Sequence, residues 1–174
     1  MNEPIHRPFN RDKIAMEIAG AMDKFVDFDG NGLLHRNLSS LTIFISSEGR
    51  IVIGGLFAAR IYDDVVTQNV VQSLWAAPEI LRGDDNYDFS VDVYSYGVIL
   101  TELDTLLHPF HQNTMKELQR NLSQWICNEG RTPTMSDTCP QWYRNLVAMC
   151  LVEDFNQRPS FQQIVDYIQT HSAL

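Results

Sequence analysis

The sequence predicts a mainly α-helical domain with one small β-hairpin. Three observations support this fold class. Apolar residues recur at helical spacing over 11–26, which is typical of an amphipathic helix. Residues 90–105 are apolar on nearly all sides, which favours a buried central helix. Two short β-branched runs within 41–54 flank a turn at 47–49, and this pattern indicates a hairpin.

The remaining elements are also predicted from local patterns. Residues 55–78 lack clean periodicity and are expected to form a long loop, a feature that is often functional in compact domains. Pro140 is placed near the start of a helix, as is common for proline. Ser160 is followed three residues later by Gln163, which matches a capping box. Three further helices are therefore predicted, over 114–127, 140–152 and 160–169.

Composition restricts the possible classes of protein. The chain has 174 residues, of which 44% are hydrophobic and 20% charged, so one globular domain with a core is expected. The net charge of -9 argues against nucleic acid and against membrane surfaces as partners. Three cysteines without metal-type spacing, and no secretory or membrane-spanning segment, favour reduced thiols and a cytoplasmic location.

Residues 27–38 match part of a calcium-binding loop. Asp27, Asp29 and Asn31 occupy the first, third and fifth positions of such a loop, and a glycine follows. The twelfth position normally supplies a bidentate carboxylate, but here it is Leu38. A polar turn after a helix explains the same residues. Calcium binding through Asp27, Asp29 and Asn31 is therefore kept as an alternative.

Four segments resemble motifs of the protein kinase family and occur in that family's order. They are LLHRNLSSLTIFISSEGRIVIGGLFAAR, LWAAPEIL, DVYSYGVILTEL and CLVEDFNQRPSFQQIVDYI. The resemblance extends from about residue 11 to 169. Trp75 before Ala-Pro-Glu, together with the RPSF sequence, is most similar to the tyrosine-kinase-like serine/threonine kinases.

The resemblance implies the C-terminal lobe of a protein kinase. The chain contains no glycine-rich phosphate loop and no Val-Ala-Ile-Lys lysine, so the N-terminal lobe is expected to be absent. The expected organisation is an N-terminal segment over 1–10, a kinase-like C-lobe domain over 11–171 and a tail over 172–174.

The catalytic positions implied by the resemblance are degenerate. Asn37 stands where the family has its catalytic aspartate, and Thr42 stands where it has a magnesium-binding asparagine. Gly55 replaces the aspartate of the Asp-Phe-Gly triplet and has no side chain to bind a metal. No catalytic residue is therefore intact, and no cofactor is expected. Binding of ATP with Mg²⁺ remains the alternative.

Residues that hold the kinase fold together are retained. The resemblance implies a buried ion pair between Glu79 and Arg158. It also implies that Asp92 accepts backbone hydrogen bonds from the turn formed by His35 and Arg36. Packing contacts are further implied for His35 under Leu56, and for Trp75 and Pro78 against the central helix.

Arg36 has two possible roles. In the family this arginine can bind a phosphorylated activation segment, and a phosphate there would form charge-assisted hydrogen bonds. The candidate phosphorylation sites are Tyr62, Thr67 and Ser73. Alternatively, Arg36 bonds nearby carbonyl groups, or Asp63 or Asp64.

These observations favour a catalytically inactive kinase-like domain, a pseudokinase. Such a domain would act as a protein-interaction, scaffold or regulatory module, with a protein partner or as a homodimer. The first alternative is a tyrosine-kinase-like serine/threonine kinase fragment that keeps some ATP binding or phosphotransfer. The second alternative is a calcium-binding module.

Overall fold

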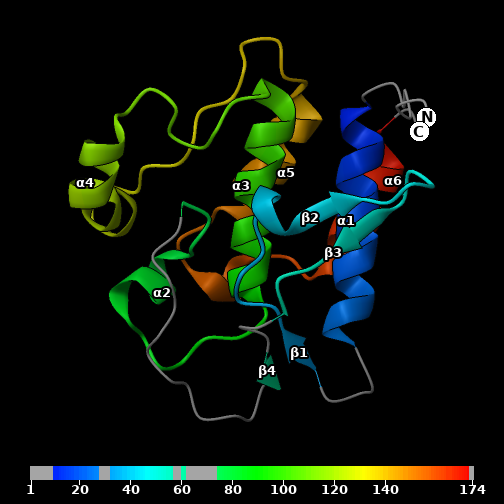
Figure 1. Ribbon diagram of the computed structural model, residues 1–174, viewed down its shortest axis with the longest axis horizontal. Helices are drawn as coiled ribbons and strands as arrows, with labels where there is room; N and C mark the ends of the chain where they lie inside the picture. The colour runs from blue at the N-terminus through cyan, green and yellow to red at the C-terminus, as the bar shows by residue number, and fades with distance from the viewer. Residues whose placement is uncertain (1–9, 28–31, 57–59, 62–73, 173–174) are drawn as a thin grey trace.

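The computed structural model describes residues 10–27, 32–56, 60–61 and 74–172 (Figure 1). Its elements, in chain order, are α1 Arg11–Val26, β1 Leu33–Leu34, η2 Ser40–Thr42, β2 Ile43–Ile45, β3 Ile51–Ile53, β4 Arg60–Ile61, α2 Pro78–Arg82, α3 Ser90–Thr105, α4 Met115–Cys127, α5 Gln141–Cys150, η4 Phe155–Gln157 and α6 Phe161–His171. The predicted class, mostly helical with a small two-stranded sheet, is confirmed.

Helix α3 is the centre of the fold. Every residue from Ser90 to Thr101 is buried, because this helix carries apolar side chains on all its faces. Figure 1 shows α3 in the middle, with α2 and α4 on one side and α1 on the other. Two buried tyrosines fix its neighbours: Tyr96 donates to the Ala15 carbonyl of α1, and Tyr143 of α5 donates to the Leu100 carbonyl, each at 3.0 Å.

The helix ends follow their capping residues. Asn10 accepts a hydrogen bond from Lys13 N–H at the start of α1. The capping box predicted at Ser160 and Gln163 is present at the start of α6. No helix in the described ranges is both long and apolar enough to cross a bilayer.

Helix α5 differs from its predicted range of 140–152 by ending at Cys150. The physical reason lies in the two carbonyl groups that come after the helix. Val152 and Glu153 direct their carbonyl oxygens to the guanidinium of Arg158, at 2.8 and 3.2 Å. The chain leaves the helix to make these contacts.

The predicted hairpin consists of β2 and β3, which pair antiparallel with Ile43 opposite Ile53. Gly49 in the turn adopts φ 75°, a left-handed conformation that glycine reaches without steric cost. Strand β4, which pairs with β1, and the first residue of α2 lie within the region predicted as a loop over 55–78. Elements of two to five residues are too short to show periodicity.

Gly97 permits the close packing of α3 against the end of α5. A Cβ atom placed on Gly97 would lie 2.7 Å from Cys150 Cβ and 2.8 Å from Leu151 Cδ2. Real Cβ atoms do not approach other atoms so closely, so a side chain here would push the two helices apart. Gly20 in α1 provides the contrast, because a Cβ placed there meets no atom within 4 Å.

We expect Gly97→Ala to destabilise the fold by about 1–3 kcal/mol, because the methyl group overpacks the contact between α3 and α5. The matched control, Gly20→Ala, should stabilise it by about 0.5–1 kcal/mol through helix propensity alone. Urea unfolding of both variants measures the two free energies. Equal effects of the two substitutions would contradict this packing.

Candidate functional site

A buried carboxylate positions the turn that follows β1. Asp92, in the first turn of α3, is 0% exposed. Its Oδ2 accepts from His35 N–H at 2.8 Å and its Oδ1 accepts from Arg36 N–H at 2.9 Å. These two bonds hold Arg36 at φ 61°, a conformation that side chains other than glycine rarely adopt. Asp92 therefore determines the path of the chain into residue 37.

Burial determines the direction of the pKa shifts of Asp92 and His35. Burial raises the pKa of Asp92 to about 6, although the two backbone N–H groups and Arg36 act in the opposite direction. Burial also lowers the pKa of His35, which favours the neutral imidazole. His35 Nε2 donates to the Gly54 carbonyl at 2.9 Å, and Nδ1 accepts from Asn37 N–H at 3.3 Å. Leu56, under which His35 was expected, is 51% exposed.

The three degenerate catalytic positions meet in space. Gly55 adopts φ 81°, and a Cβ placed on it would lie 2.6 Å from Thr42 Cγ2 and 3.2 Å from Asn37 Nδ2. The Thr42 methyl group therefore fills the space that a side chain at Gly55 would need. Residues 37, 42 and 55 therefore lie close together, although strands β2 and β3 separate Gly55 from the other two in the sequence.

The Thr42 hydroxyl is already used within its own turn. It lies 3.1 Å from the Asn37 carbonyl oxygen and accepts from Ser39 N–H at 3.1 Å. The site thus offers an amide, a locally bonded hydroxyl and a glycine. Within the described part of the chain, no group of three or more His, Cys, Asp or Glu side chains could hold a metal ion. The described groups at these three positions bring neither a general base nor a carboxylate for a cation.

Arg36 lies beside this site without a salt bridge in the described residues. Its Nε is buried and has no hydrogen-bond partner there, and its guanidinium carbon is 5.7 Å from the centre of the Tyr87 ring. Next to Arg36 and Asn37 is a cavity of about 20 Å³, which has room for about one water molecule. The candidate phosphorylation sites Tyr62, Thr67 and Ser73, and the alternative partners Asp63 and Asp64, lie outside the described residues.

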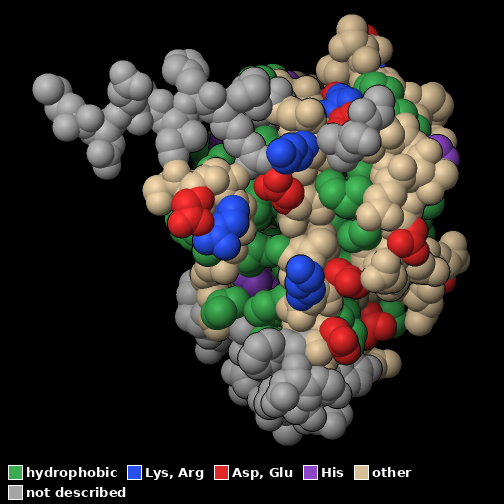
Figure 2. Space-filling view, turned by 90° about the vertical axis from the view of Figure 1, so that its right-hand side faces the viewer, with side chains coloured by type: hydrophobic (Ala, Val, Ile, Leu, Met, Phe, Trp, Pro, Cys, Tyr) green, Lys and Arg blue, Asp and Glu red, His purple; other side chains and the backbone are tan. Residues whose placement is uncertain are grey.

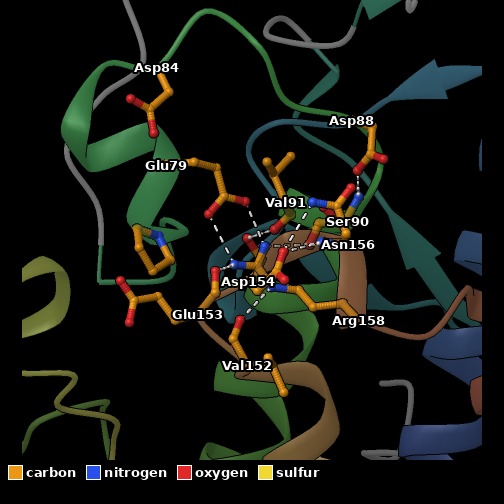
Figure 3. Close-up of polar contacts among 12 residues, drawn as sticks. Glu79, Asp84, Asp88, Ser90, Val91, Val152, Glu153, Asp154, Asn156 and Arg158 are labelled. Atoms are coloured by element: carbon orange, nitrogen blue, oxygen red, sulfur yellow. Dashed lines mark hydrogen bonds and ion pairs between the residues drawn. The ribbon is translucent and has the colours of Figure 1, made fainter.

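The ion pair expected between Glu79 and Arg158 is present, and both side chains are almost fully buried (Figure 3). Arg158 Nη2 donates to Glu79 Oε2 at 2.9 Å, and Nη1 donates to Oε1. The remaining N–H groups reach the carbonyls of Ser90, Val152 and Glu153. All five N–H groups of the guanidinium therefore have acceptors. One side chain joins α2, the start of α3 and the turn after α5.

Trp75 packs the segment before α2 against α3, as expected. The residue is 6% exposed, and its Nε1–H donates to Glu102 Oε2 at 2.7 Å. Ser95 of α3 donates to the Trp75 carbonyl at 2.8 Å. Pro78, the first residue of α2, is also buried.

Only part of the predicted calcium site is described, because Asp29 and Asn31 lie outside the described residues. Asp27 is described: it is exposed and forms the C-terminal cap of α1, with its backbone N–H donating to the Asp23 carbonyl. Gly32 adopts φ 66° with the Phe89 ring against it, since a Cβ placed there would lie 2.5 Å from that ring. Packing and backbone conformation therefore account for the glycine.

Comparison with known proteins gives a consistent result. The sequence matches the family model of the protein kinase domain over residues 9–168. A probable serine/threonine-protein kinase of Dictyostelium discoideum is 32% identical over 156 residues, which are 89% of this chain and 11% of that protein. Cyclic GMP-binding protein C of the same organism is 34% identical over 163 residues, which are 90% of this chain and 6% of that protein.

A probable LIM domain-containing serine/threonine-protein kinase of Dictyostelium discoideum is 28% identical over 167 residues, which are 92% of this chain and 24% of that protein. The chain thus spans 6% to 24% of the length of these three relatives. The comparison concerns one domain of much longer proteins.

We expect Glu79→Gln to destabilise the fold by about 3–5 kcal/mol, because it leaves the Arg158 charge buried without its counter-ion. The control is Arg82→Gln, which removes solvent-exposed ion pairs with Asp84 and Glu153 and should cost less than about 1 kcal/mol. Chemical unfolding measures both. A double variant, Glu79→Leu with Arg158→Met, should lose less than the sum of its single variants. Additive losses would show that the two charges do not interact.

Asp92 gives the stability a specific pH dependence. Its pKa of about 6 in the folded protein exceeds the value of about 4 in an unfolded chain, so the folded protein binds more protons between these pH values. The contribution of Asp92 to the free energy of unfolding therefore falls by about 3 kcal/mol as the pH rises from about 4 to 6.

The matched variant is Asp92→Asn, which cannot titrate. The wild-type free energy of unfolding minus that of the variant should be greatest near pH 4 and should decrease toward pH 7. Urea unfolding across this range measures the difference. An increase toward pH 7 would place the pKa of Asp92 below its value in the unfolded chain and contradict the burial effect.

Proposed function

This chain belongs to the protein kinase domain family, and we propose that it is a catalytically inactive, tyrosine-kinase-like member of it. In this proposal, residues 11–171 correspond to the helical C-terminal lobe of a kinase. The domain acts by binding a protein partner or a second copy of itself, as a scaffold or regulatory module.

The convergence of Asn37, Thr42 and Gly55 is the observation that carries this proposal. Phosphoryl transfer depends on a positioned base and on magnesium ligands, and these three positions would supply both. An amide cannot take a proton from a substrate hydroxyl, and a lost base lowers the rate about 10²–10⁴-fold. A side chain at position 55 would be unfavourable for two reasons. The backbone has φ 81°, which residues other than glycine rarely adopt, and the Thr42 methyl group occupies the space. One substitution is therefore insufficient to rebuild the site.

The retained residues support binding as the role of the domain. Asp92 and the Glu79–Arg158 pair contribute to the fold through buried hydrogen bonds to other parts of this chain. A stable domain without its catalytic groups can still present a surface that binds a protein partner.

The hairpin and the residue that follows Gly55 provide such a surface. Phe44, Ile45, Val52 and Leu56 are 55%, 58%, 47% and 51% exposed. Phe44 and Val52 lie opposite each other on β2 and β3, so their side chains share one face. Exposed apolar patches of this kind are typical of protein–protein contacts. Figure 2 shows the side of the molecule on the right of Figure 1, where hydrophobic side chains reach the surface among groups of both charges.

A serine/threonine protein kinase is the second candidate, because two of the relatives described above carry the name of probable serine/threonine-protein kinases. In that case the chain would bind Mg-ATP or take part in phosphotransfer. Nucleotide binding separates the two candidates.

We expect the melting temperature of the purified chain to be unchanged by millimolar Mg-ATP. A ligand present at 100 times its Kd would add about 2.7 kcal/mol of stability, which is a shift of several degrees. An active serine/threonine kinase domain serves as the positive control. A magnesium-dependent shift would contradict the inactive assignment and favour the second candidate.

Phosphotransfer to a generic protein substrate provides the second readout. The wild-type chain and Asn37→Asp should both be inactive, because the substitution restores the carboxylate but leaves positions 42 and 55 unchanged. Activity of the wild type, or a gain of activity in Asn37→Asp, would overturn the proposal.

A further inference from the structure

Strand β2 has an open edge. In the described part of the chain, β2 and β3 form a sheet of two strands. Helix α1 packs against β3, whereas β2 has no second strand beside it among the described residues. The edge of a strand without a neighbour can pair with a further strand.

The hydrogen bonds of the hairpin show which backbone groups point outward. The Thr42 carbonyl accepts from Gly54 N–H at 2.8 Å, and Ser46 N–H donates to the Arg50 carbonyl at 2.9 Å. Successive residues of an antiparallel strand direct their backbone groups to opposite edges. Ile45, one residue before Ser46, therefore directs its N–H and its C=O away from β3. Among the described residues, no segment outside the hairpin bonds to these two groups.

The side chains along this edge are apolar and exposed. Phe44 is 55% exposed and Ile45 is 58% exposed. Consecutive residues of a strand point to opposite faces, so apolar surface is open on both faces of the edge. Proteins normally protect such an edge with a charged side chain, a proline or a bulge. The Ile-Phe-Ile sequence of β2 contains neither charge nor proline, and its register with β3 is regular.

The distribution of charge favours a second copy of this chain as the occupant of the edge. The net charge is -9, so two copies repel each other over much of their surfaces. Residues 37–47 and 51–56 contain no charged side chain, and the two charges of the turn, Glu48 and Arg50, pair with each other. Two copies can therefore meet at this edge without bringing like charges together. The edge also offers no charge that would select an acidic or a basic partner.

A two-fold axis makes β2 complementary to itself. Across such an axis a strand pairs antiparallel with its own copy. With the axis at Phe44, the Ile45 N–H of each copy faces the Ile43 carbonyl of the other copy. The two Phe44 side chains then lie side by side as a non-hydrogen-bonded pair. Each hairpin becomes half of a four-stranded sheet, and sheets of three or more strands are more stable than an isolated pair.

We propose that this chain forms a symmetric dimer through antiparallel pairing of β2 with the β2 strand of a second copy. The pairing covers Phe44 and Ile45 and provides partners for the outward backbone groups of Ile45. This inference rests on the proposed binding role of the domain, and it specifies the partner and the mode of contact. Because β2 has only three residues, the contact is small, and we expect a dissociation constant on the order of 10–100 µM.

Sedimentation equilibrium of the purified chain, at concentrations from about 5 to 500 µM, tests the dimer. Ile45→Lys puts two like charges beside the axis and should raise the dissociation constant at least about tenfold. The matched control, Val52→Lys, puts the same charge opposite Phe44 on β3, away from the edge. The two new charges are then more than a Debye length apart, so the dissociation constant should change less than about threefold. Thermal melting confirms that each variant is folded.

Disulfide cross-linking tests the position of the axis. The half-buried Cys127 is first replaced by serine. Phe44→Cys should then form an intermolecular disulfide on mild oxidation with copper phenanthroline, because the Cβ atoms of such a pair lie about 4.5–5.5 Å apart. Val52→Cys should stay reduced and monomeric on a denaturing gel, because three strand spacings, about 14 Å, separate its two copies.

Three results would overturn the proposal. A chain that stays monomeric at every concentration would exclude the dimer, while the inactive assignment would stand, since nucleotide binding and phosphotransfer test it separately. Equal effects of Ile45→Lys and Val52→Lys, or a disulfide in Val52→Cys, would assign the contact to the face of the hairpin. A monomer that binds the peptide acetyl-Leu-Thr-Ile-Phe-Ile-Ser-Ser-amide, and loses this binding in Ile45→Lys, would assign the edge to a strand of another protein.

Discussion

The buried ion pair between Glu79 and Arg158 is the constraint on which the rest of the structure depends. Two charges removed from water are stable only when every donor and acceptor is satisfied, because an unpaired buried charge is costly. Arg158 meets this condition with acceptors from three separate parts of the chain, at Glu79, at Ser90 and at Val152–Glu153. The geometry of one guanidinium therefore sets how α2, α3 and the end of α5 meet.

Asp92, in the first turn of α3, is a second buried charged group whose oxygens have hydrogen-bond donors. Its carboxylate replaces water for two backbone N–H groups and holds Arg36 in a left-handed conformation. The hydrogen bonds of Asp92 to the His35 and Arg36 N–H groups do not involve the side chains at positions 37, 42 and 55. Asn37 lines the same small cavity as Asp92, so an aspartate at position 37 would add negative charge near it, and like charges raise the cost of ionisation. An amide and a glycine at these positions add no such charge.

The sequence predicts those features that depend on neighbouring residues. Helices α1 and α3 have their predicted ends, and α6 begins with its predicted capping box, because periodicity and caps are local. Helix α2 has the local markers of a short helix, Pro78 at its start and Gly83 at φ 77° after its end, but five residues show no period. The β1–β4 pair and the hydrogen bond from Arg158 to the Ser90 carbonyl join distant segments, and no local pattern contains that information.

The η2 turn connects positions 37, 42 and 55 with helix α3. Thr42, at its end, fills the space next to Gly55, while Ser40, at its start, donates to Glu102 of α3. The Thr42 hydroxyl also accepts from Ser39 N–H and so closes the turn. A substitution that removes this hydroxyl would loosen both sides at once, because a single hydrogen-bonded turn of three residues supports them. The described structure therefore gives this turn a structural role of its own.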